Sequence, residues 1–284
     1  MEYVTLNNGV KMPMVGFGVF EIPKEKTAEC VFNAIEIGYR MIDTAQAYYN
    51  EQEVGVGIKK AIKEFGLNRE DIFITTKVWV TEFGYDKTKA SVEESLRKLQ
   101  VEYINLVLIH QCLSDYYGAY RALEDLYDEG KIKAIGISNF SAERMADIAT
   151  FNRVVPAVNQ IETHLFWQQY YLHEWCNKYN IQHEAWGPLA QHRLKEVIEN
   201  PLVREIAENH GKTPAQVALR HHIQRGIVVI PKSLHKERMK QNIEIFDFEL
   251  TDSEMEKLKS LDENKSMWAE YDDPMIVQYA MAEE

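Results

Sequence analysis

Eight short apolar runs, separated by longer amphipathic segments, recur along the 284-residue chain and constrain its fold more than any other feature. The runs are too continuously apolar for half-exposed antiparallel strands and are typical of parallel strands covered on both faces. They span residues 14–19, 39–44, 72–78, 104–110, 132–138, 157–163, 181–186 and 226–231. Eight strand–helix units in a chain of this length predict one α/β domain, residues 1–284, folded as a (β/α)8 TIM barrel.

The segments between the runs carry the periodicity and the stop signals of helices. Val92, Leu96 and Leu99 fall at i, i+4 and i+7, as a buried helical stripe requires. Three helical patterns end at a glycine, the residue favoured just past a helix end, before the next run begins. These glycines are Gly38, Gly130 and Gly226.

Both ends of the chain add an element to the predicted barrel. Residues 4–14, VTLNNGVKMPM, predict a small hairpin that turns at Asn8-Gly9. Near the other end, Thr251 and Glu254 form a capping-box pattern that predicts a helix continuing through Leu261.

A doubly wound open sheet is the alternative fold for such alternating units. Its dinucleotide-binding form places a GxGxxG pattern between the first strand and the following helix. Here Gly16-Phe17-Gly18 lacks the third glycine and leads into residues 21–26, EIPKEK, rather than directly into a helix. The pattern therefore favours the barrel.

Composition excludes several classes of partner. The net charge of −12 at pH 7 argues against a nucleic-acid surface or an anionic membrane. No apolar stretch approaches the roughly 20 residues of a membrane helix, and the N-terminus lacks the basic start and apolar core of a signal peptide. The three cysteines, Cys30, Cys112 and Cys176, form neither a disulfide framework nor a zinc pattern. We expect a cytoplasmic monomer that holds no metal and acts on a small molecule.

Seven of the eight runs bring a polar or aromatic side chain to the rim formed by the C-terminal ends of the strands, where barrels carry their chemistry. One such residue is most often a satisfied structural group, but a whole ring is hard to explain as structure. The ring consists of Asp43 with Tyr48, Lys77, His110, Ser138 with Asn139, Gln160, Trp186, and Lys232 with Ser233.

Four of these side chains suit proton transfer to an oxygen. A phenol titrates near pH 10, and a close ammonium lowers that value, so Lys77 can tune Tyr48 as a general acid or base. Asp43 can hold Lys77 in the buried mouth, and His110 can orient a carbonyl by a hydrogen bond. The set suits protonation of an oxygen whose carbon has just received a hydride, which requires a cofactor because no side chain donates hydride.

Downstream residues could hold the nicotinamide of such a cofactor. Trp186 could stack on a flat ring. The hydroxyl of Ser138 and the amides of Asn139 and Gln160 could pair with a carboxamide.

The segment IPKSLHKERMKQN, residues 230–242, could bind a phosphate. Lys232, Ser233 and Arg238 surround a predicted helix start, where cations, a hydroxyl and free backbone N–H groups together favour an anion. A solvated basic helix face is the alternative for this segment.

Two other functions fit part of the pattern. A barrel aldolase would use Lys77 as its Schiff-base amine, but the downstream stacking and phosphate residues would then lack a purpose. A regulatory or redox-sensing barrel would bind the cofactor without turnover, and the presence of all four proton-transfer residues argues against it.

From residues 9–18 to residues 258–266, the chain resembles the aldo-keto reductase family, nearest its bacterial and protozoan members that reduce small ketones and aldehydes. The matching landmarks, in order, are RMIDTAQAYYNE (40–51), ITTKVW (74–79), LVLIH (106–110), GISNF (136–140), NQIE (159–162), EAWGPL (184–189) and IPKS (230–233) with Arg238 and Asn242. Matching the first of these selects Tyr48, rather than Tyr49, as the reactive phenol.

The resemblance implies an NADPH-dependent carbonyl reductase with Tyr48, Asp43, Lys77 and His110 as its catalytic residues. It implies that NADPH lies across the mouth, with Arg238 and its neighbours on the 2′-phosphate and Asn242 on adenine. The cofactor site so implied is Gly18, Val19, Asp43, Ser138, Asn139, Gln160, Trp186, Gly187, Leu189, Lys232, Ser233, Arg238 and Asn242. The substrate site so implied is Phe20, Tyr48, Trp79, His110 and Gln111.

Several positions depart from the family's pattern. Gln111 follows the histidine where many relatives have tryptophan, which suggests a more polar substrate pocket. Gly187 stands where serine is usual, and Gln241 stands where glutamate often contacts adenine. The tail, residues 262–284, fits the family's variable C-terminus, which often folds over the substrate.

Overall fold

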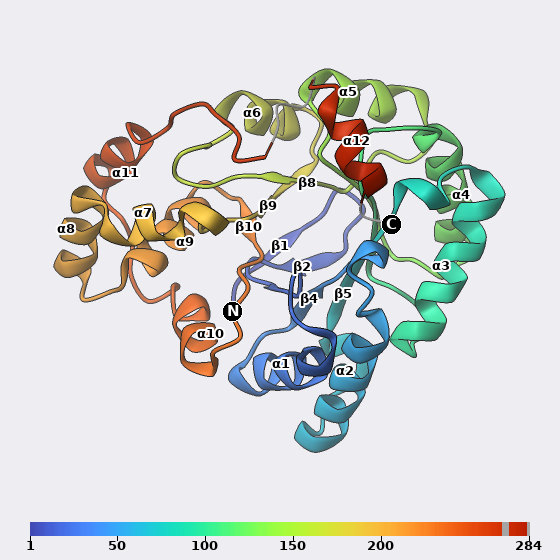
Figure 1. Ribbon diagram of the computed structural model, residues 1–284, viewed down its shortest axis with the longest axis horizontal. Coiled ribbons are helices and arrows are strands. Elements are labelled where there is room, and N and C mark those ends of the chain that lie inside the picture. Colours follow the sequence, from blue (N-terminus) through green and yellow to red (C-terminus); the bar gives the residue numbers. More distant parts are fainter. Residues whose placement is uncertain (269–272, 283–284) are drawn as a thin grey trace.

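The computed structural model describes residues 1–268 and 273–282 and has a ring of eight parallel strands at its centre (Figure 1). The strands pair in chain order: β3 Phe17–Gly18, β4 Met41–Asp43, β5 Phe73–Val78, β6 Leu106–Ile109, β7 Ile135–Ser138, β8 Val158–Glu162, β9 Gln182–Trp186 and β10 Val228–Val229. A parallel bridge between Val15 and Val229 closes the ring, and the Gly16 N–H donates to the Val229 carbonyl at 2.8 Å. Each strand lies inside one of the predicted apolar runs, which confirms the TIM barrel.

Helices surround this ring; among the described residues, one α-helix joins each pair of consecutive strands from β3 to β9, three lie between β9 and β10, and three follow β10. They are α1 Lys24–Ile37, α2 Glu51–Phe65, α3 Tyr85–Leu99, α4 Tyr116–Asp128, α5 Ala142–Phe151, α6 Tyr170–Lys178, α7 Leu194–Glu199, α8 Pro201–His210, α9 Pro214–Gln224, α10 Lys236–Ile243, α11 Asp252–Lys259 and α12 Met275–Ala282. The predicted stripe of Val92, Leu96 and Leu99 is buried on α3. None of the helices within the described ranges is long and apolar enough to cross a bilayer.

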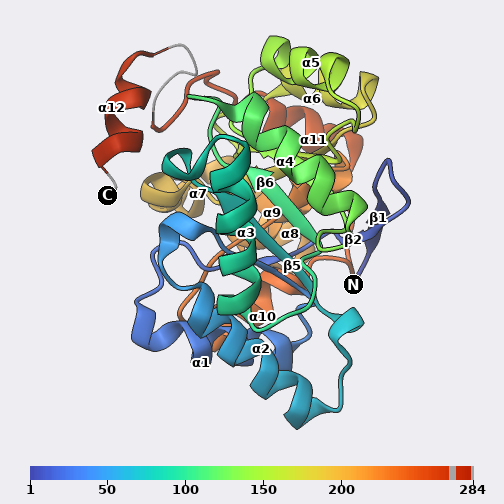
Figure 2. The same cartoon turned by 90° about the vertical axis from the view of Figure 1, so that its right-hand side faces the viewer.

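The predicted hairpin is present as β1 Tyr3–Thr5 and β2 Lys11–Pro13, which pair antiparallel. Figure 2 shows that the hairpin and α12 lie at opposite ends of the barrel. The chain therefore closes one end of the barrel with its first residues and approaches the other end with its last described helix.

The helix α11 begins at the predicted capping box but ends at Lys259, two residues before the predicted Leu261. The reason lies in the residues that follow. Asp262 accepts a hydrogen bond from the Gln168 N–H at 3.1 Å, and Glu263 donates its N–H to the Phe166 carbonyl at 2.9 Å. These contacts pull the chain out of the helix and along the segment that follows β8.

Candidate active site

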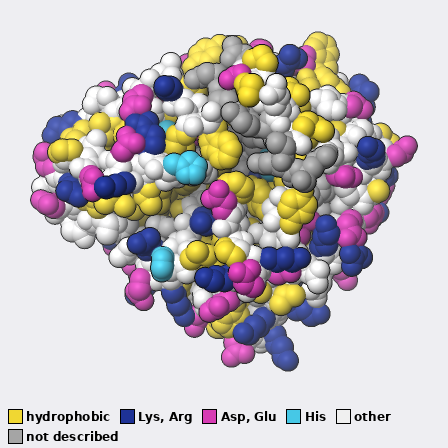
Figure 3. Space-filling view, viewed as in Figure 1, with side chains coloured by type: hydrophobic (Ala, Val, Ile, Leu, Met, Phe, Trp, Pro, Cys, Tyr) yellow, Lys and Arg dark blue, Asp and Glu magenta, His cyan; other side chains and the backbone are white. Residues whose placement is uncertain are grey.

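A cavity of about 450 Å³ opens at the C-terminal ends of the strands, on the face seen in Figure 3. Charged side chains of both signs cover the periphery of this face, and hydrophobic side chains gather nearer its centre. Most predicted site residues line the cavity: Gly18, Phe20, Asp43, Tyr48, Trp79, His110, Gln111, Ser138, Asn139, Gln160, Trp186, Gly187, Leu189 and Lys232. The predicted residues that do not line it are Val19, Lys77, Ser233, Arg238 and Asn242.

Lys77 connects the proton-transfer residues from beneath the cavity. It lies in β5 and is fully buried. Its Nζ donates to Asp43 Oδ1 at 2.6 Å, to the Thr44 carbonyl at 3.0 Å and to Tyr48 Oη at 3.2 Å. Asp43 ends β4, and Tyr48 ends the short 3-10 turn Gln46–Tyr48, so two consecutive elements supply both partners. The neighbouring Tyr49 is 64% exposed, and the contact with Lys77 therefore distinguishes Tyr48.

The charges of this cluster follow from its burial. Burial alone would lower the pKa of Lys77, but the Asp43 carboxylate and Tyr48 outweigh it and raise that pKa above its ordinary value. Lys77 is therefore a cation at neutral pH. Burial and the charge of Lys77 together hold the pKa of His110 well below its usual range. His110 is therefore a neutral imidazole, and its ring lies edge-on to Trp79 and Tyr48.

Asn139 organises the next part of the rim. It has a left-handed backbone with φ of 61°, a conformation that asparagine tolerates better than most residues. Its Nδ2 donates to the His110 carbonyl at 3.2 Å, and its Oδ1 accepts from the Trp186 indole N–H at 2.8 Å. The amide of Asn139 therefore fixes the orientation of Trp186. The adjacent Ser138 hydroxyl is buried and has no hydrogen-bond partner within the described ranges.

Gln160 links the cluster to a carboxyl that the sequence analysis missed. Its Nε2 donates to Asp43 Oδ2 and to Glu184 Oε2, both at 2.9 Å. Glu184 lies in the middle of β9 and is fully buried. Burial, followed by the charge of Asp43, raises the pKa of Glu184 above its usual range. The signal for Glu184 was a carboxylate inside an otherwise buried run, IQHEAW.

Comparison with known proteins identifies the family to which the chain belongs. The model of the Aldo/keto reductase family matches residues 14–263. The chain belongs to that family. It is therefore an oxidoreductase that acts on carbonyl groups with a nicotinamide cofactor.

Similar proteins cover nearly the whole chain of this aldo-keto reductase. It is 45% identical over 266 residues to the glyoxal reductase of Bacillus subtilis (strain 168), spanning 93% of this chain and 94% of that protein. It is 43% identical over 271 residues to the 9,11-endoperoxide prostaglandin H2 reductase of Trypanosoma cruzi (strain CL Brener), spanning 95% and 94%. The crystal structure of MGS-M4, an aldo-keto reductase enzyme from a Medee basin deep-sea metagenome library, matches with a TM-score of 0.91 and 43% identity, covering 96% of this chain and 99% of that one.

The remaining predicted cofactor residues of this aldo-keto reductase do not line the cavity. Val19 is fully buried and joins β3 to β4, because its N–H donates to the Asp43 carbonyl at 3.1 Å. The Ser233 hydroxyl accepts the His235 N–H at 3.0 Å in the turn before α10. Arg238 is exposed on α10, whereas Asn242 is buried.

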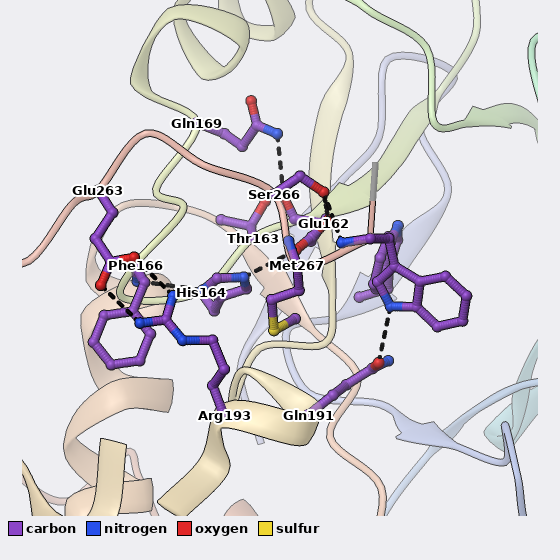
Figure 4. Close-up of polar contacts among 12 residues, drawn as sticks. Glu162, Thr163, His164, Phe166, Gln169, Gln191, Arg193, Glu263, Ser266 and Met267 are labelled. Carbon is purple, nitrogen blue, oxygen red and sulfur yellow. Dashed lines mark hydrogen bonds and ion pairs between the residues drawn. The ribbon is translucent and has the colours of Figure 1, made fainter. Parts of the chain in front are cut away.

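The segment that follows α11, residues 262–268, lies against the mouth of the cavity (Figure 4). Glu162, at the end of β8, is 3% exposed and accepts from the Ser266 hydroxyl at 2.6 Å and from the Met267 N–H at 2.7 Å. His164 Nε2 donates to the same carboxylate at 3.0 Å, since its Nδ1 accepts the Phe166 N–H.

Two further contacts tie this segment to the loop after β9. Glu263 pairs with both terminal nitrogens of Arg193 at 2.7–2.8 Å, and the Trp268 indole N–H donates to Gln191 Oε1 at 3.2 Å. Trp268 lines the cavity and meets Trp186 edge-on with ring centroids 6.4 Å apart. The sequence analysis placed the tail near the substrate without assigning any of these side chains.

Proposed function

We propose that this enzyme is an NADPH-dependent carbonyl reductase in which Tyr48 protonates the substrate oxygen. The observation that carries the proposal is the buried contact of Lys77 Nζ with both Asp43 Oδ1, at 2.6 Å, and Tyr48 Oη, at 3.2 Å. A cation beside a phenol at the wall of a cavity is the arrangement that a general acid of high intrinsic pKa needs.

The chain's own residues divide the proton chemistry among them. When bound, NADPH supplies the hydride that reduces the carbonyl carbon. Tyr48 Oη gives its proton to the carbonyl oxygen, and the charge of Lys77 stabilises the phenolate that remains. Asp43 keeps Lys77 charged in its buried position, at 2.6 Å. His110, as a neutral imidazole, orients the carbonyl oxygen toward Tyr48.

The rim residues fit the nicotinamide of such a cofactor. The Ser138 hydroxyl is a buried polar group without a partner among the described residues, so a carboxamide would satisfy it. Gln160 lines the same part of the cavity and offers a second amide contact. Trp186, whose indole is oriented by Asn139, offers a flat surface for the ring.

The segment around α10 supports a preference for NADPH over NADH. Lys232 and Arg238 are exposed cations on either side of the helix start, where free N–H groups also favour an anion. We propose that these side chains bind the 2′-phosphate with Ser233, and that Asn242 contacts adenine. Gly18, Gly187 and Leu189 belong to the wall along which the cofactor extends.

The substrate end of the cavity fits a small aldehyde or ketone. Phe20, Trp79 and Gln111 line it from the barrel, and Trp268, Ile276 and Ala280 line it from the tail. We propose that the tail covers the substrate. The glyoxal reductase relative suggests small 2-oxoaldehydes as the first carbonyls to assay.

Replacement of Tyr48 tests the mechanism. Tyr48→Phe should abolish oxidation of NADPH by a small aldehyde while leaving the Kd for NADPH nearly unchanged, and Tyr49→Phe should retain activity. Turnover by Tyr48→Phe at the wild-type rate would refute the proton-donor role. Absence of turnover in the wild type across a carbonyl panel would instead favour a regulatory barrel, and borohydride trapping of a substrate on Lys77 would favour an aldolase.

A further inference from the structure

Glu184 is a buried carboxyl group that the proton chemistry does not use. It is fully buried in β9, and within residues 1–268 and 273–282 its Oε1 has no hydrogen-bond partner and no cation forms an ion pair with it. Lys77, whose charge acts on Glu184, is itself paired with Asp43. An apolar side chain of similar size would avoid the cost of burying this group. The hydrogen bond that Glu184 accepts from Gln160 therefore indicates why a carboxyl group is present at this position.

The amide of Gln160 is held at two points by carboxyl oxygens. One acceptor is Asp43 Oδ2 and the other is Glu184 Oε2, each 2.9 Å from Gln160 Nε2. An amide nitrogen has two N–H groups, so the two acceptors use both. A single acceptor would fix the position of the nitrogen but leave the amide plane free to turn, whereas two acceptors fix the plane as well.

The two acceptors also determine which end of the amide faces the cavity. Asp43 forms an ion pair with Lys77, and an amide carbonyl oxygen cannot face a carboxylate oxygen at 2.9 Å without repulsion. The NH2 end of Gln160 therefore faces Asp43 and Glu184. Its carbonyl oxygen faces away from both, in a side chain that lines the cavity.

We propose that Glu184 is a positioning residue for the cofactor: it holds the Gln160 amide so that the Gln160 carbonyl oxygen accepts a hydrogen bond from the nicotinamide carboxamide. This inference rests on the role proposed for Gln160 above. It assigns to Glu184 an effect on cofactor recognition that is exerted entirely through Gln160.

The chemistry of the pocket agrees with an uncharged Glu184. Burial and the neighbouring charge of Asp43 both raise the pKa of its carboxyl, and a protonated carboxyl still accepts a hydrogen bond through its carbonyl oxygen. The charged groups that face it are Asp43 on β4 and Lys77 on β5. Because the role needs an acceptor and no charge, Glu184→Gln should preserve it and Glu184→Leu should remove it.

The experiment compares three ligands by titration of tryptophan fluorescence or by calorimetry. NADP⁺ has the carboxamide, its 3-acetylpyridine analogue lacks the carboxamide N–H groups, and adenosine 2′,5′-bisphosphate lacks the nicotinamide. Wild type should bind NADP⁺ more tightly than the analogue. Glu184→Leu should weaken NADP⁺ by roughly three- to tenfold, the effect of one lost hydrogen bond, and should leave the other two ligands unchanged.

Two further variants make the test specific. Gln160→Leu should lose the same preference for NADP⁺, and the Glu184→Leu/Gln160→Leu double variant should lose no more than Gln160→Leu alone. Glu184→Gln should bind all three ligands like wild type. Unchanged binding of adenosine 2′,5′-bisphosphate shows that each variant is folded.

The outcomes separate this inference from the proposed function. If Glu184→Leu keeps the wild-type preference for NADP⁺, or weakens all three ligands equally, the positioning role is wrong while the proposed function stands. If wild type binds NADP⁺ and the acetylpyridine analogue equally well, the role of Gln160 is wrong and the role of Glu184 falls with it. If wild type binds none of the three ligands, the proposed function itself fails.

Discussion

Removal of the Glu162 carboxylate should loosen residues 262–268 at the mouth of the cavity. This carboxylate is buried and accepts hydrogen bonds from Ser266 and Met267, which attach the segment to the end of β8 (Figure 4). Trp268, which lines the cavity, follows them directly in the chain. Glu162→Ala should therefore remove one wall of the substrate pocket without touching the proton-transfer residues.

The size of the effect follows from the contacts. A hydrogen bond to a charged group contributes about 1.5–3 kcal/mol, so two such bonds hold the segment with about 3–6 kcal/mol. The ion pair of Arg193 and Glu263 is partly exposed, with side chains 26% and 45% accessible, and contributes about 0.2–1 kcal/mol. The hydrogen bond of Trp268 with Gln191 and the contacts of Asp262 and Glu263 with the segment after β8 remain in the variant. The two bonds to Glu162 are therefore the strongest polar attachment that the variant loses, and residues 266–268 should become more mobile.

Loss of Trp268 from the cavity should lower kcat/KM for the carbonyl substrate and leave the Kd of NADPH nearly unchanged. An aromatic wall of this kind contributes about 1.5–3 kcal/mol, which corresponds to a roughly ten- to hundredfold lower kcat/KM. The assay is oxidation of NADPH by a small aldehyde, with the Kd of NADPH and hydrogen exchange of residues 262–268 measured in parallel. The matched control is Glu263→Gln, which breaks only the exposed pair and should change kcat/KM less than about fivefold.

The reasoning is refuted if Glu162→Ala retains both the wild-type kcat/KM and the wild-type protection of residues 262–268 from exchange. A fall in kcat/KM with unchanged protection would also contradict it, because the effect would then not come from the segment. Ser266→Ala removes one of the two bonds and should give an intermediate result.

Further predictions concern the cofactor, the substrate and acid stability. Arg238→Ala should weaken NADPH by roughly ten- to hundredfold and leave NADH nearly unchanged, and equal losses for both cofactors in a binding titration would contradict the phosphate role. Gln111→Trp should shift the ratio of kcat/KM from hydroxylated toward aromatic carbonyls, and an unchanged ratio would remove Gln111 as a determinant of polarity. Burial lowers the pKa of His173 to about 4 and that of His221 to about 3. Between about pH 6.5 and these values the unfolded chain binds protons that the folded chain does not. The free energy of unfolding should therefore decrease by about 1.4 kcal/mol for each histidine per pH unit as the pH is lowered through this range. Denaturant titrations at several pH values would measure this decrease.

The barrel was predictable because its strands are buried on both faces and therefore read as continuous apolar runs. The ends of those runs were equally informative: Asp43 and His110 break apolar stretches at the rim, and burial explains why each needs a partner or a function there. Helix ends were less predictable. The end of α11 depends on contacts of Asp262 and Glu263 with residues nearly a hundred positions earlier, which no local pattern encodes.

What the sequence did not predict depends on the register between neighbouring parallel strands. Gln160 lies opposite Glu184, and Glu162 lies opposite Trp186, in the pairing of β8 with β9. The first pair places Gln160 beside Glu184, the carboxyl that accepts from its amide. The second places Glu162 beside Trp186, whose indole meets Trp268. A shift of one residue in this pairing would turn every side chain of one strand to the other face. A change of register between two strands leaves the amino-acid sequence of each run unchanged. The sequence therefore predicts which polar residues lie at the rim, but it does not predict which of them are in contact.

The positions of Glu184 and Glu162 along their strands explain why we expect the two carboxyl groups to affect different ligands. Side chains two residues apart on a strand point to the same face, so Gln160 and Glu162 follow one another toward the mouth. Gln160 contacts Glu184 and Asp43 in the buried layer, whereas Glu162 receives the tail at the surface of the cavity. The strand β8 therefore carries both Gln160, which we propose orients the nicotinamide carboxamide, and Glu162, which holds residues 266 and 267 beside the proposed substrate pocket. Variants at Glu184 should therefore change discrimination among cofactors, and variants at Glu162 should change discrimination among carbonyls, although the two residues lie on adjacent strands.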